Sequence, residues 1–250
     1  MLEGIAYIIS NSPDKKHKNV FEELCNKSIL FARQHLKLPI AILCLGDKCN
    51  VKADHIIDGT KYLEKHLKPG EETHGLIAAE LLKTYIAEWS PFDRTLYLDC
   101  DAFIMKPAAK DYIDVLSYGY DLSLSTCITM EWKDSIEKTA VKDGIFKDVP
   151  SYFPYWNFGI FGSHKGSGPI LDKIREEFLT YCFGGWSKFG SVPHAQPAVV
   201  RAAFGLAPNH KIFTMPAKYN CHFAGAGGYV FSGSPIILHL WKDIREMMLR

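Results

Sequence analysis

The chain has 250 residues, and its 47% hydrophobic and 23% charged residues are ordinary proportions for a globular protein with a substantial core. A formal net charge of +1 without a basic run argues against a nucleic-acid-binding surface. Residues 1–4 lack the basic region and long apolar stretch of a signal peptide, and no stretch approaches the roughly 20 apolar residues of a membrane span. We therefore expect a cytoplasmic protein with no transmembrane segment.

Cysteine usage points the same way. The seven cysteines are odd in number, scattered along the chain and without a CxxC pair. This pattern fits reduced thiols better than a disulfide framework.

In the first half of the chain, short apolar runs alternate with segments of helical periodicity. Strands are expected at 4–10, 39–45, 55–58 and 95–98, and helices at 20–35 and 71–89. The second helix carries the strongest periodicity of the chain and ends at Ser90-Pro91. Strands that alternate with helices indicate βαβ units, so the predicted fold class is α/β, with a Rossmann-like, mainly parallel sheet flanked by helices.

The second half is less regular. Strands are expected at 121–129, 155–162 and 236–241, and helices at 168–183 and 193–204. Residues 130–150 are polar and poorly periodic, which indicates a loop or lid, and the glycine-rich stretch 225–228 indicates a flexible loop. Because no linker and no internal repeat divides the sequence, we expect one domain over residues 1–250.

Two carboxylates follow the apolar run 95–98, at Asp99 and Asp101. Side chains two residues apart in a strand point to the same side, so this pair can aim at one point beyond the strand's carboxyl end, where open α/β sheets bind ligands. Two carboxylates suit Mg²⁺ or Mn²⁺, and these ions in turn hold phosphates. The alternative is a strand-end turn with solvated carboxylates.

Four segments, taken in chain order, resemble a known family. They are Lys83 with Leu96-Tyr97-Leu98-Asp99-Cys100-Asp101; Trp156-Asn157-Phe158-Gly159-Ile160-Phe161; His194-Ala195-Gln196-Pro197-Ala198 with the later Met215-Pro216 and Tyr219-Asn220; and His239-Leu240-Trp241. In this order they resemble the glycosyltransferase-A fold enzymes, which use nucleotide-diphosphate sugars, and above all the branch that includes glycogenin and the bacterial lipopolysaccharide galactosyltransferases. The resemblance implies a nucleotide-binding half at 1–105 and a sugar and acceptor half at 106–250.

The resemblance also implies roles for individual residues. Asp99, Asp101 and His239 would hold Mn²⁺ or Mg²⁺, and Lys83 would add positive charge at the diphosphate. Asn157 and Gln196 would orient the sugar through their amides, and together with Asp101 they are the expected catalytic residues. Further residues implied at the nucleotide sugar are Ile9, Ser10 and Asn11 in the turn after the first strand, Cys100, Gly159, Trp241 and Lys242.

Each of these residues also has a purely structural interpretation. His239 would be a core histidine, Lys83 an exposed surface lysine and Cys100 a small buried filler. Asn157 and Gln196 would be turn and cap residues. Gly159 either lets the sugar approach the backbone closely or marks a β-bulge.

The sequence departs from the family pattern at two places. The aspartate that usually precedes the glutamine is Ala195 here, so the role of that acid is missing or is supplied elsewhere. The longer ending of the family is compressed to His239-Leu240-Trp241-Lys242, which affects the reach of Lys242.

The resulting hypothesis is transfer of a monosaccharide from a nucleotide-diphosphate sugar, in the first place a UDP-sugar, to a hydroxyl acceptor. If the reaction retains the anomeric configuration, no strong base is required; if it inverts, Glu131, Asp134 or Asp143 is available as the base. One alternative is a haloacid-dehalogenase-like phosphatase, although that class usually carries its Asp-x-Asp on the first strand. The other is a catalytically inactive nucleotide-sugar-binding protein.

Overall fold

The structure is a computed structural model that describes residues 1–10, 15–45, 49–66, 75–126, 146, 148–150, 153–184, 195–206, 209–223 and 234–240. The side chains of residues 15–19, 76, 181–184, 222 and 223 are not described. Within the described part of the chain, none of the helices has the length and hydropathy needed to cross a membrane.

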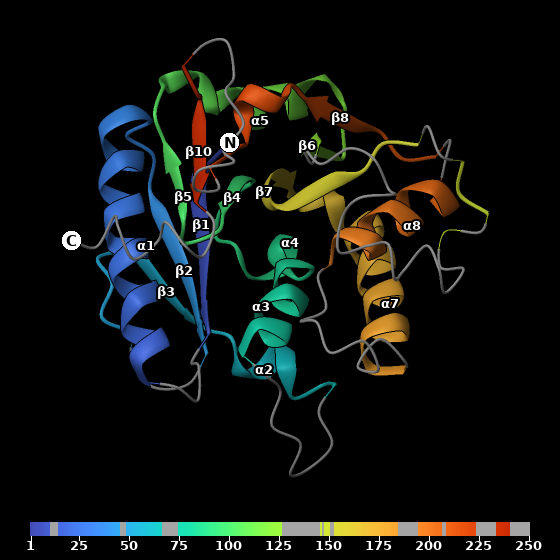
Figure 1. The fold of residues 1–250 in the computed structure, drawn as a ribbon, viewed down its shortest axis with the longest axis horizontal. Helices are drawn as coiled ribbons and strands as arrows, with labels where there is room; N and C mark the ends of the chain where they lie inside the picture. The colour runs from blue at the N-terminus through green and yellow to red at the C-terminus, as the bar shows by residue number, and fades with distance from the viewer. Residues whose placement is uncertain are drawn as a thin grey trace.

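A seven-stranded sheet with the strand order β3-β2-β1-β4-β7-β6-β8 forms the centre of the fold (Figure 1). Its strands are β1 (Glu3–Ser10), β2 (Ile40–Leu45), β3 (His55–Asp58), β4 (Arg94–Leu98), β6 (Leu122–Thr126), β7 (Trp156–His164) and β8 (Ile212–Met215). Strands β3, β2, β1 and β4 are parallel, as are β6 and β8, whereas β7 runs antiparallel to β4 and β6. The predicted α/β class with a mainly parallel sheet is confirmed.

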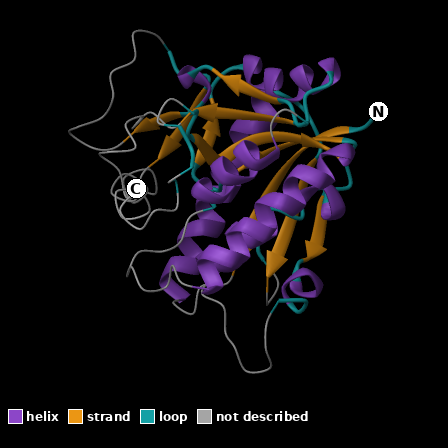
Figure 2. Cartoon of the chain, turned by 90° about the vertical axis from the view of Figure 1, so that its right-hand side faces the viewer, coloured by secondary structure: helices purple, strands orange, loops and turns teal. Residues whose placement is uncertain are grey.

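Helices lie on both sides of this sheet (Figure 2). The helices are α1 (Lys15–His35), α2 (Thr60–Leu63), α3 (Gly75–Lys83), α4 (Ile86–Trp89), α5 (Asp111–Asp114), α7 (Gly168–Gly184) and α8 (Gln196–Leu206). Short 3-10 turns are η1 (Pro107–Lys110), η2 (Val115–Tyr118), η3 (Lys165–Ser167) and η5 (Ala217–Tyr219).

Strand alternation assigns the two faces of the sheet to different helices. In β1, Ile5, Tyr7 and Ile9 pack into the cluster that contains α1 and α5, whereas Ala6 and Ile8 pack into the cluster that contains α2, α3, α4, α7 and α8. Because β1 is buried on both faces, it reads in the sequence as an almost continuous apolar run.

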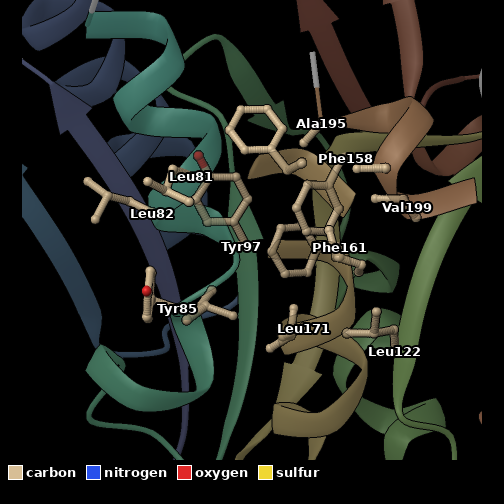
Figure 3. Packing of buried hydrophobic residues seen from close by; sticks show 14 of the residues in the cluster. Leu81, Leu82, Tyr85, Tyr97, Leu122, Phe158, Phe161, Leu171, Ala195 and Val199 are labelled. Carbon is tan, nitrogen blue, oxygen red and sulfur yellow. The ribbon is translucent and has the colours of Figure 1, made fainter. Parts of the chain in front are cut away.

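A stack of buried aromatic rings joins α3, the central strands and α8 (Figure 3). The Phe161 ring centroid lies 4.9 Å from that of Tyr97 on β4 and 4.4 Å from that of Phe158 on β7. Leu81 of α3 and Val199 of α8 belong to the same buried cluster. Aromatic pairs in this geometry add about 0.5–1.5 kcal/mol each beyond the burial of their area, so this core fixes the elements that carry the site.

The helix expected at 71–89 is interrupted in the structure. Helix α3 ends at Lys83 and α4 begins at Ile86. At the break, the Thr84 hydroxyl donates to the Leu81 carbonyl at 2.6 Å, and the Trp89 indole N–H donates to the Leu82 carbonyl at 3.1 Å. The same two carbonyls also accept the backbone N–H groups of Thr84 and Tyr85, three residues on, so the last turn of α3 tightens in a way that an apolar periodicity does not reveal.

A second sheet of three short strands carries the end of the described chain. It consists of β5 (Ala102–Ile104), β10 (Ile237–Leu240) and β9 (Cys221–Phe223), with β10 antiparallel to β5 and parallel to β9. The last strand was predicted, at 236–241, but its two partners were not. Segments of three residues are too short to give a readable alternation.

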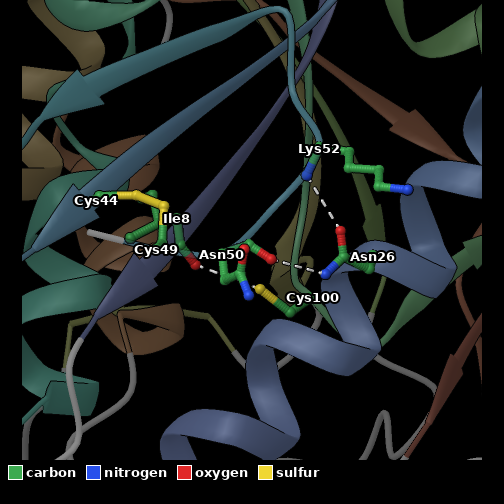
Figure 4. Close-up of a disulfide and its surroundings, with 7 residues drawn as sticks. All are labelled: Ile8, Asn26, Cys44, Cys49, Asn50, Lys52 and Cys100. Atoms are coloured by element: carbon green, nitrogen blue, oxygen red, sulfur yellow. Dashed lines mark hydrogen bonds between the residues drawn. A yellow bond between two sulfur atoms is a disulfide. The ribbon is translucent and has the colours of Figure 1, made fainter. Parts of the chain in front are cut away.

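A disulfide between Cys44 and Cys49 corrects the expectation of reduced thiols (Figure 4). The two Cα atoms lie 6.4 Å apart, within the range that a disulfide spans. The count and spacing of cysteines do not reveal where the chain returns after β2, so this pair escaped prediction. Among the described cysteines, Cys25, Cys100 and Cys221 are free and buried. The cytoplasmic location stays a prediction.

Candidate active site

Asp99, Asp101 and His239 converge just beyond the carboxyl end of β4. One ligand atom from each residue lies within 4.8 Å of the others. The His239 Nε2 atom is 3.2 Å from Asp101 Oδ1 and 3.9 Å from Asp99 Oδ2. Among the described residues, this is the one group of three or more such side chains that could hold a metal ion.

A turn, rather than strand alternation, brings the two aspartates together. Strand β4 ends at Leu98, and the Ala102 N–H donates to the Asp99 carbonyl at 3.0 Å. The expectation that both carboxylates project from one side of a strand is therefore wrong. The predicted convergence holds, because the chain reverses tightly between β4 and β5.

The second sheet places His239 at this turn. In β10, His239 pairs with Ala102 of β5, and the Leu240 N–H donates to the Asp101 carbonyl at 3.0 Å. The histidine therefore lies in register with the aspartate turn, although the two are far apart in the sequence. Its side chain is 9% exposed, which leaves access for a ligand.

The donor set fits a divalent cation. Two carboxylates and one imidazole match the ligands that Mn²⁺ accepts. The Asn220 Oδ1 atom lies 3.0 Å from His239 Nδ1 and accepts its hydrogen, and the Nε2 atom faces the aspartates. Asn220 is fully buried. Tyr219-Asn220 belongs to a segment that resembles the family, but no local pattern connects this amide with a histidine on another strand.

Lys83 is a buried lysine in direct contact with the aspartate turn. Its Nζ lies 3.0 Å from Asp99 Oδ1 and 2.6 Å from Glu80 Oε1, and its side chain is 3% exposed. Burial lowers the pKa of Lys83, but the carboxylates of Asp99 and Glu80 outweigh it and raise the pKa above its usual value. The interpretation as an exposed surface lysine is therefore wrong, and the side chain carries a fixed positive charge.

Tyr97 adds a further contact to Asp99. Its hydroxyl donates to Asp99 Oδ1 at 2.8 Å, and the Asp99 N–H donates to the Gly159 carbonyl at 2.8 Å. Burial raises the pKa of Asp99 above its usual value, the attraction of Lys83 opposes this shift, and repulsion from Asp101 adds to it. The carboxylates of Asp99, Asp101 and Glu80 outnumber the single ammonium of Lys83 here, and this surplus of negative charge favours a bound cation.

Gly159 lies against the metal-binding group itself. A Cβ at this position would stand 2.5 Å from Asp99 Oδ2 and 2.7 Å from His239 Cε1. The pairing of β6 with β7 shifts register between Leu124 and Ser125, so β7 carries a bulge around the glycine. Both interpretations of Gly159 stay open, and close approach of two protein side chains requires the glycine here.

Asn157 and Gln196 have different surroundings. The buried Asn157 accepts the Gly159 N–H at 2.8 Å with its Oδ1, within the bulge. Gln196 is the first residue of α8, and the Tyr155 hydroxyl donates to its Oε1 at 3.4 Å. Asn157 therefore contacts Gly159, which lies against the metal-binding group. Gln196 makes no such contact, and only the start of α8, where it lies, is joined to the neighbourhood of that group.

The start of α8 meets α3 at Glu80. The Ala195 N–H donates to Glu80 Oε2 at 3.1 Å, while the other oxygen of Glu80 binds Lys83. Sequence reasoning missed Glu80 because the two partners are distant in the chain. The helical spacing to Lys83 was the only signal that could have pointed to it.

The residues expected to bind the nucleoside lie at the carboxyl end of β1. Ile9 is buried and Ser10 half-buried there, and the neighbouring Cys100 Sγ donates to the Ile8 carbonyl at 3.4 Å. Cys100 is a small buried residue that packs the aspartate turn against β1. The remaining expected residues lie outside the described part of the chain: Asn11, Glu131, Asp134, Asp143, His194, Trp241, Lys242 and the stretch 225–228.

No protein-family model matches the chain, and no curated protein sequence is significantly similar to it. Solved structures share its fold. The apo form of mouse xyloside xylosyltransferase 1 aligns with a TM-score of 0.60 and 10% identity, over 96% of this chain and 97% of that one. Galactosyltransferase LgtC with donor and acceptor sugar analogues aligns with a TM-score of 0.60 and 12% identity, over 96% of this chain and 87% of that one. An active-site mutant of LgtC, with glutamine replaced by glutamate, aligns with a TM-score of 0.56. The chain therefore has the glycosyltransferase-A fold.

Proposed function

We propose that this chain, which has the glycosyltransferase-A fold, is a metal-dependent glycosyltransferase. It moves a monosaccharide from a nucleotide-diphosphate sugar, in the first place a UDP-sugar, to a hydroxyl acceptor. The observation that carries the proposal is the convergence of Asp99, Asp101 and His239 beyond the carboxyl end of a central strand. Ligands of open α/β sheets bind at this edge.

The protein's own charges are arranged to hold an anionic donor through a cation. Asp99, Asp101 and His239 provide the ligand atoms, and Asn220 accepts the Nδ1 hydrogen of His239, which leaves Nε2 facing Asp101. When bound, Mn²⁺ or Mg²⁺ supplies a Lewis acid that neutralises charge developing on the leaving diphosphate. Lys83 lies 3.0 Å from Asp99 and adds a buried positive charge at the same place.

Binding of the donor is divided between the two halves of the single domain. Residues 1–105 hold the nucleotide, with Ile9, Ser10 and Asn11 at the nucleoside. Residues 106–250 hold the sugar and the acceptor, with Asn157 and Gln196 orienting the sugar. An active-site glutamine in LgtC supports a role for Gln196. Such positioning contributes about 7–11 kcal/mol where reacting groups are aligned well.

The acceptor's proton has two alternative routes. With retention at the anomeric carbon, the departing phosphate oxygen takes the proton and no protein base is required. With inversion, one carboxylate among Glu131, Asp134 and Asp143 takes it. Product stereochemistry, read by NMR of the anomeric proton, distinguishes the two.

A thermal-shift panel of nucleotide sugars and free nucleotides, with and without Mn²⁺, tests the proposal. Stabilisation by a UDP compound only in the presence of metal supports it, and the donor that stabilises most then enters a transfer assay.

Asp101→Asn should abolish metal-dependent turnover. Full activity of the Asp101→Asn variant would contradict the proposed metal-dependent transfer. Binding of metal and UDP without transfer or hydrolysis would identify an inactive nucleotide-sugar-binding protein, and a response to phosphate monoesters alone would identify a phosphatase.

A further inference from the structure

We propose that Glu80 is a positioning residue that holds Lys83 away from full pairing with Asp99 and fixes the start of α8. This inference rests on the proposed function, because it concerns the same metal and donor site. Glu80 contributes no ligand atom to the metal-binding group, and it belongs to no sequence motif.

The first contact of Glu80 controls the ammonium of Lys83. Glu80 Oε1 lies 2.6 Å from Lys83 Nζ, while the nearest oxygen of Asp99 lies 3.0 Å from the same atom. The buried ammonium is thus shared between two carboxylates that are partly exposed. Its shorter distance is to the carboxylate that lies outside the metal-binding group.

This sharing keeps Asp99 available as a metal ligand. If Glu80 lost its charge, Asp99 would be the remaining carboxylate beside the buried ammonium, and the two would pair more tightly. The ammonium would then compete with the divalent cation for the same oxygens. The negative charge around the site would also fall by one unit. Both effects weaken cation binding.

The second contact of Glu80 controls the start of α8. Ala195 precedes the first residue of this helix and has no side-chain acceptor for the unpaired N–H groups of the first turn. Glu80 Oε2 accepts the Ala195 N–H at 3.1 Å and brings a negative charge to the positive end of the helix. A carboxylate from α3 therefore does what the N3 glutamate of a capping box does in other helices, since it accepts the backbone N–H of the N-cap residue.

The two contacts together join three parts of the site. One side chain links the lysine beside the metal-binding aspartate to the backbone that carries Gln196. The side chain of Glu80 is 16% exposed, so it borders the site without being sealed in the core.

Three variants test the proposal: Glu80→Gln, Glu80→Asp and the matched control Glu176→Gln. Glu176 also pairs with a lysine at a spacing of three residues, Lys173 at 2.9 Å, but it is 66% exposed and belongs to the outer face of α7. Mn²⁺ affinity is measured by the electron paramagnetic resonance signal of free Mn²⁺, without any substrate. Turnover of the donor found in the thermal-shift panel is measured at saturating Mn²⁺.

We expect Glu80→Gln to weaken Mn²⁺ binding about tenfold, the lower end for outer partners of metal ligands. Glu80→Asp keeps the charge and should stay within about threefold of the wild type, and Glu176→Gln should bind as the wild type does. At saturating Mn²⁺, Glu80→Gln should still show a lower kcat with little change in KM, because the start of α8 has moved.

The relative Mn²⁺ affinities of Glu80→Gln and Glu80→Asp distinguish an effect of the charge of Glu80 from an effect of its packing. If the shorter aspartate weakens Mn²⁺ binding as much as the glutamine does, or if neither variant changes it, the inference is overturned while the proposed function stands. If the wild-type protein binds no Mn²⁺, the proposed function fails and the inference fails with it.

Discussion

His239 donates its Nδ1 hydrogen to the side-chain oxygen of Asn220, at 3.0 Å. Asn220 is wholly buried and belongs to the segment that leads into β9, whereas His239 lies on the neighbouring strand β10. This contact fixes the tautomer that a metal site needs, and it turns the Nε2 atom toward Asp101.

Asn220→Leu should weaken Mn²⁺ binding about 10–100-fold, because the imidazole loses the partner that fixes its tautomer and its orientation. The measurement is a Mn²⁺ titration of variant and wild type. Asn26→Leu is the control: Asn26 also binds backbone groups through its amide, at Asn50 and Lys52, and should leave Mn²⁺ binding unchanged. Equal affinity for wild type and Asn220→Leu would remove Asn220 from the site.

Gly159→Ala should abolish stabilisation by Mn²⁺ and lower the free energy of unfolding by about 1–3 kcal/mol, since the new methyl group collides with Asp99 and His239. Gly205→Ala in α8 is the matched control. A Cβ at Gly205 would meet nothing within 4 Å, and alanine favours the helix by about 0.5–1 kcal/mol. Chemical denaturation of both variants, with and without Mn²⁺, measures the contrast. A Gly159→Ala protein that still responds to Mn²⁺ contradicts the packing of the site.

Opening the bridge between Cys44 and Cys49 should destabilise the fold by about 2 kcal/mol, the loop-closure value for so short a loop. Cys49→Ser, compared with the wild type by chemical denaturation without reductant, tests this. Peptide mapping checks the bridge directly: one fragment should contain both cysteines and gain two hydrogens on reduction. Two separately alkylated thiols in protein purified without reductant would contradict the disulfide.

Stability should depend on pH through His66. Burial lowers the pKa of His66, and the charges of Arg175 and Lys65 lower it further, so the folded protein binds this proton less readily than the unfolded chain. The stabilisation is present above the unfolded pKa of about 6.5 and is lost as the pH falls below it. Between about pH 7.5 and about pH 5.5, the wild-type Tm should therefore fall more than that of His66→Gln. Parallel curves for the two proteins would contradict the shift.

The parts of the fold that the sequence predicted are those determined by a few neighbouring residues. The burial of β1 on both faces, the apolar run of β4 and the aspartates after it are all readable in short windows. The short strands β5 and β9 are not, because three residues give no alternation and their stability comes from pairing with β10. At the break after Lys83, a hydroxyl and an indole bind helix carbonyls, and these contacts leave no trace in the apolar periodicity.

The candidate site divides in the same way. Asp99, Asp101, His239 and Lys83 were found because residue type and family order single them out. Glu80 was missed, and Tyr97 and Asn220 stood in quoted segments without a role of their own, since the importance of all three lies in contacts across the fold. The sequence singles out Gly159 only as a glycine in a strand. The structure shows why a larger residue does not fit there: its Cβ would collide with Asp99 and His239.

The pairing of β5 with β10 has a consequence for the timing of synthesis. Two ligand atoms come from a turn reached before the middle of the chain, and the third comes from a strand at its far end. A nascent chain on the ribosome can assemble β1, β2 and β4 long before His239 has been added. The complete set of three ligand atoms therefore forms only after β10 has been synthesised.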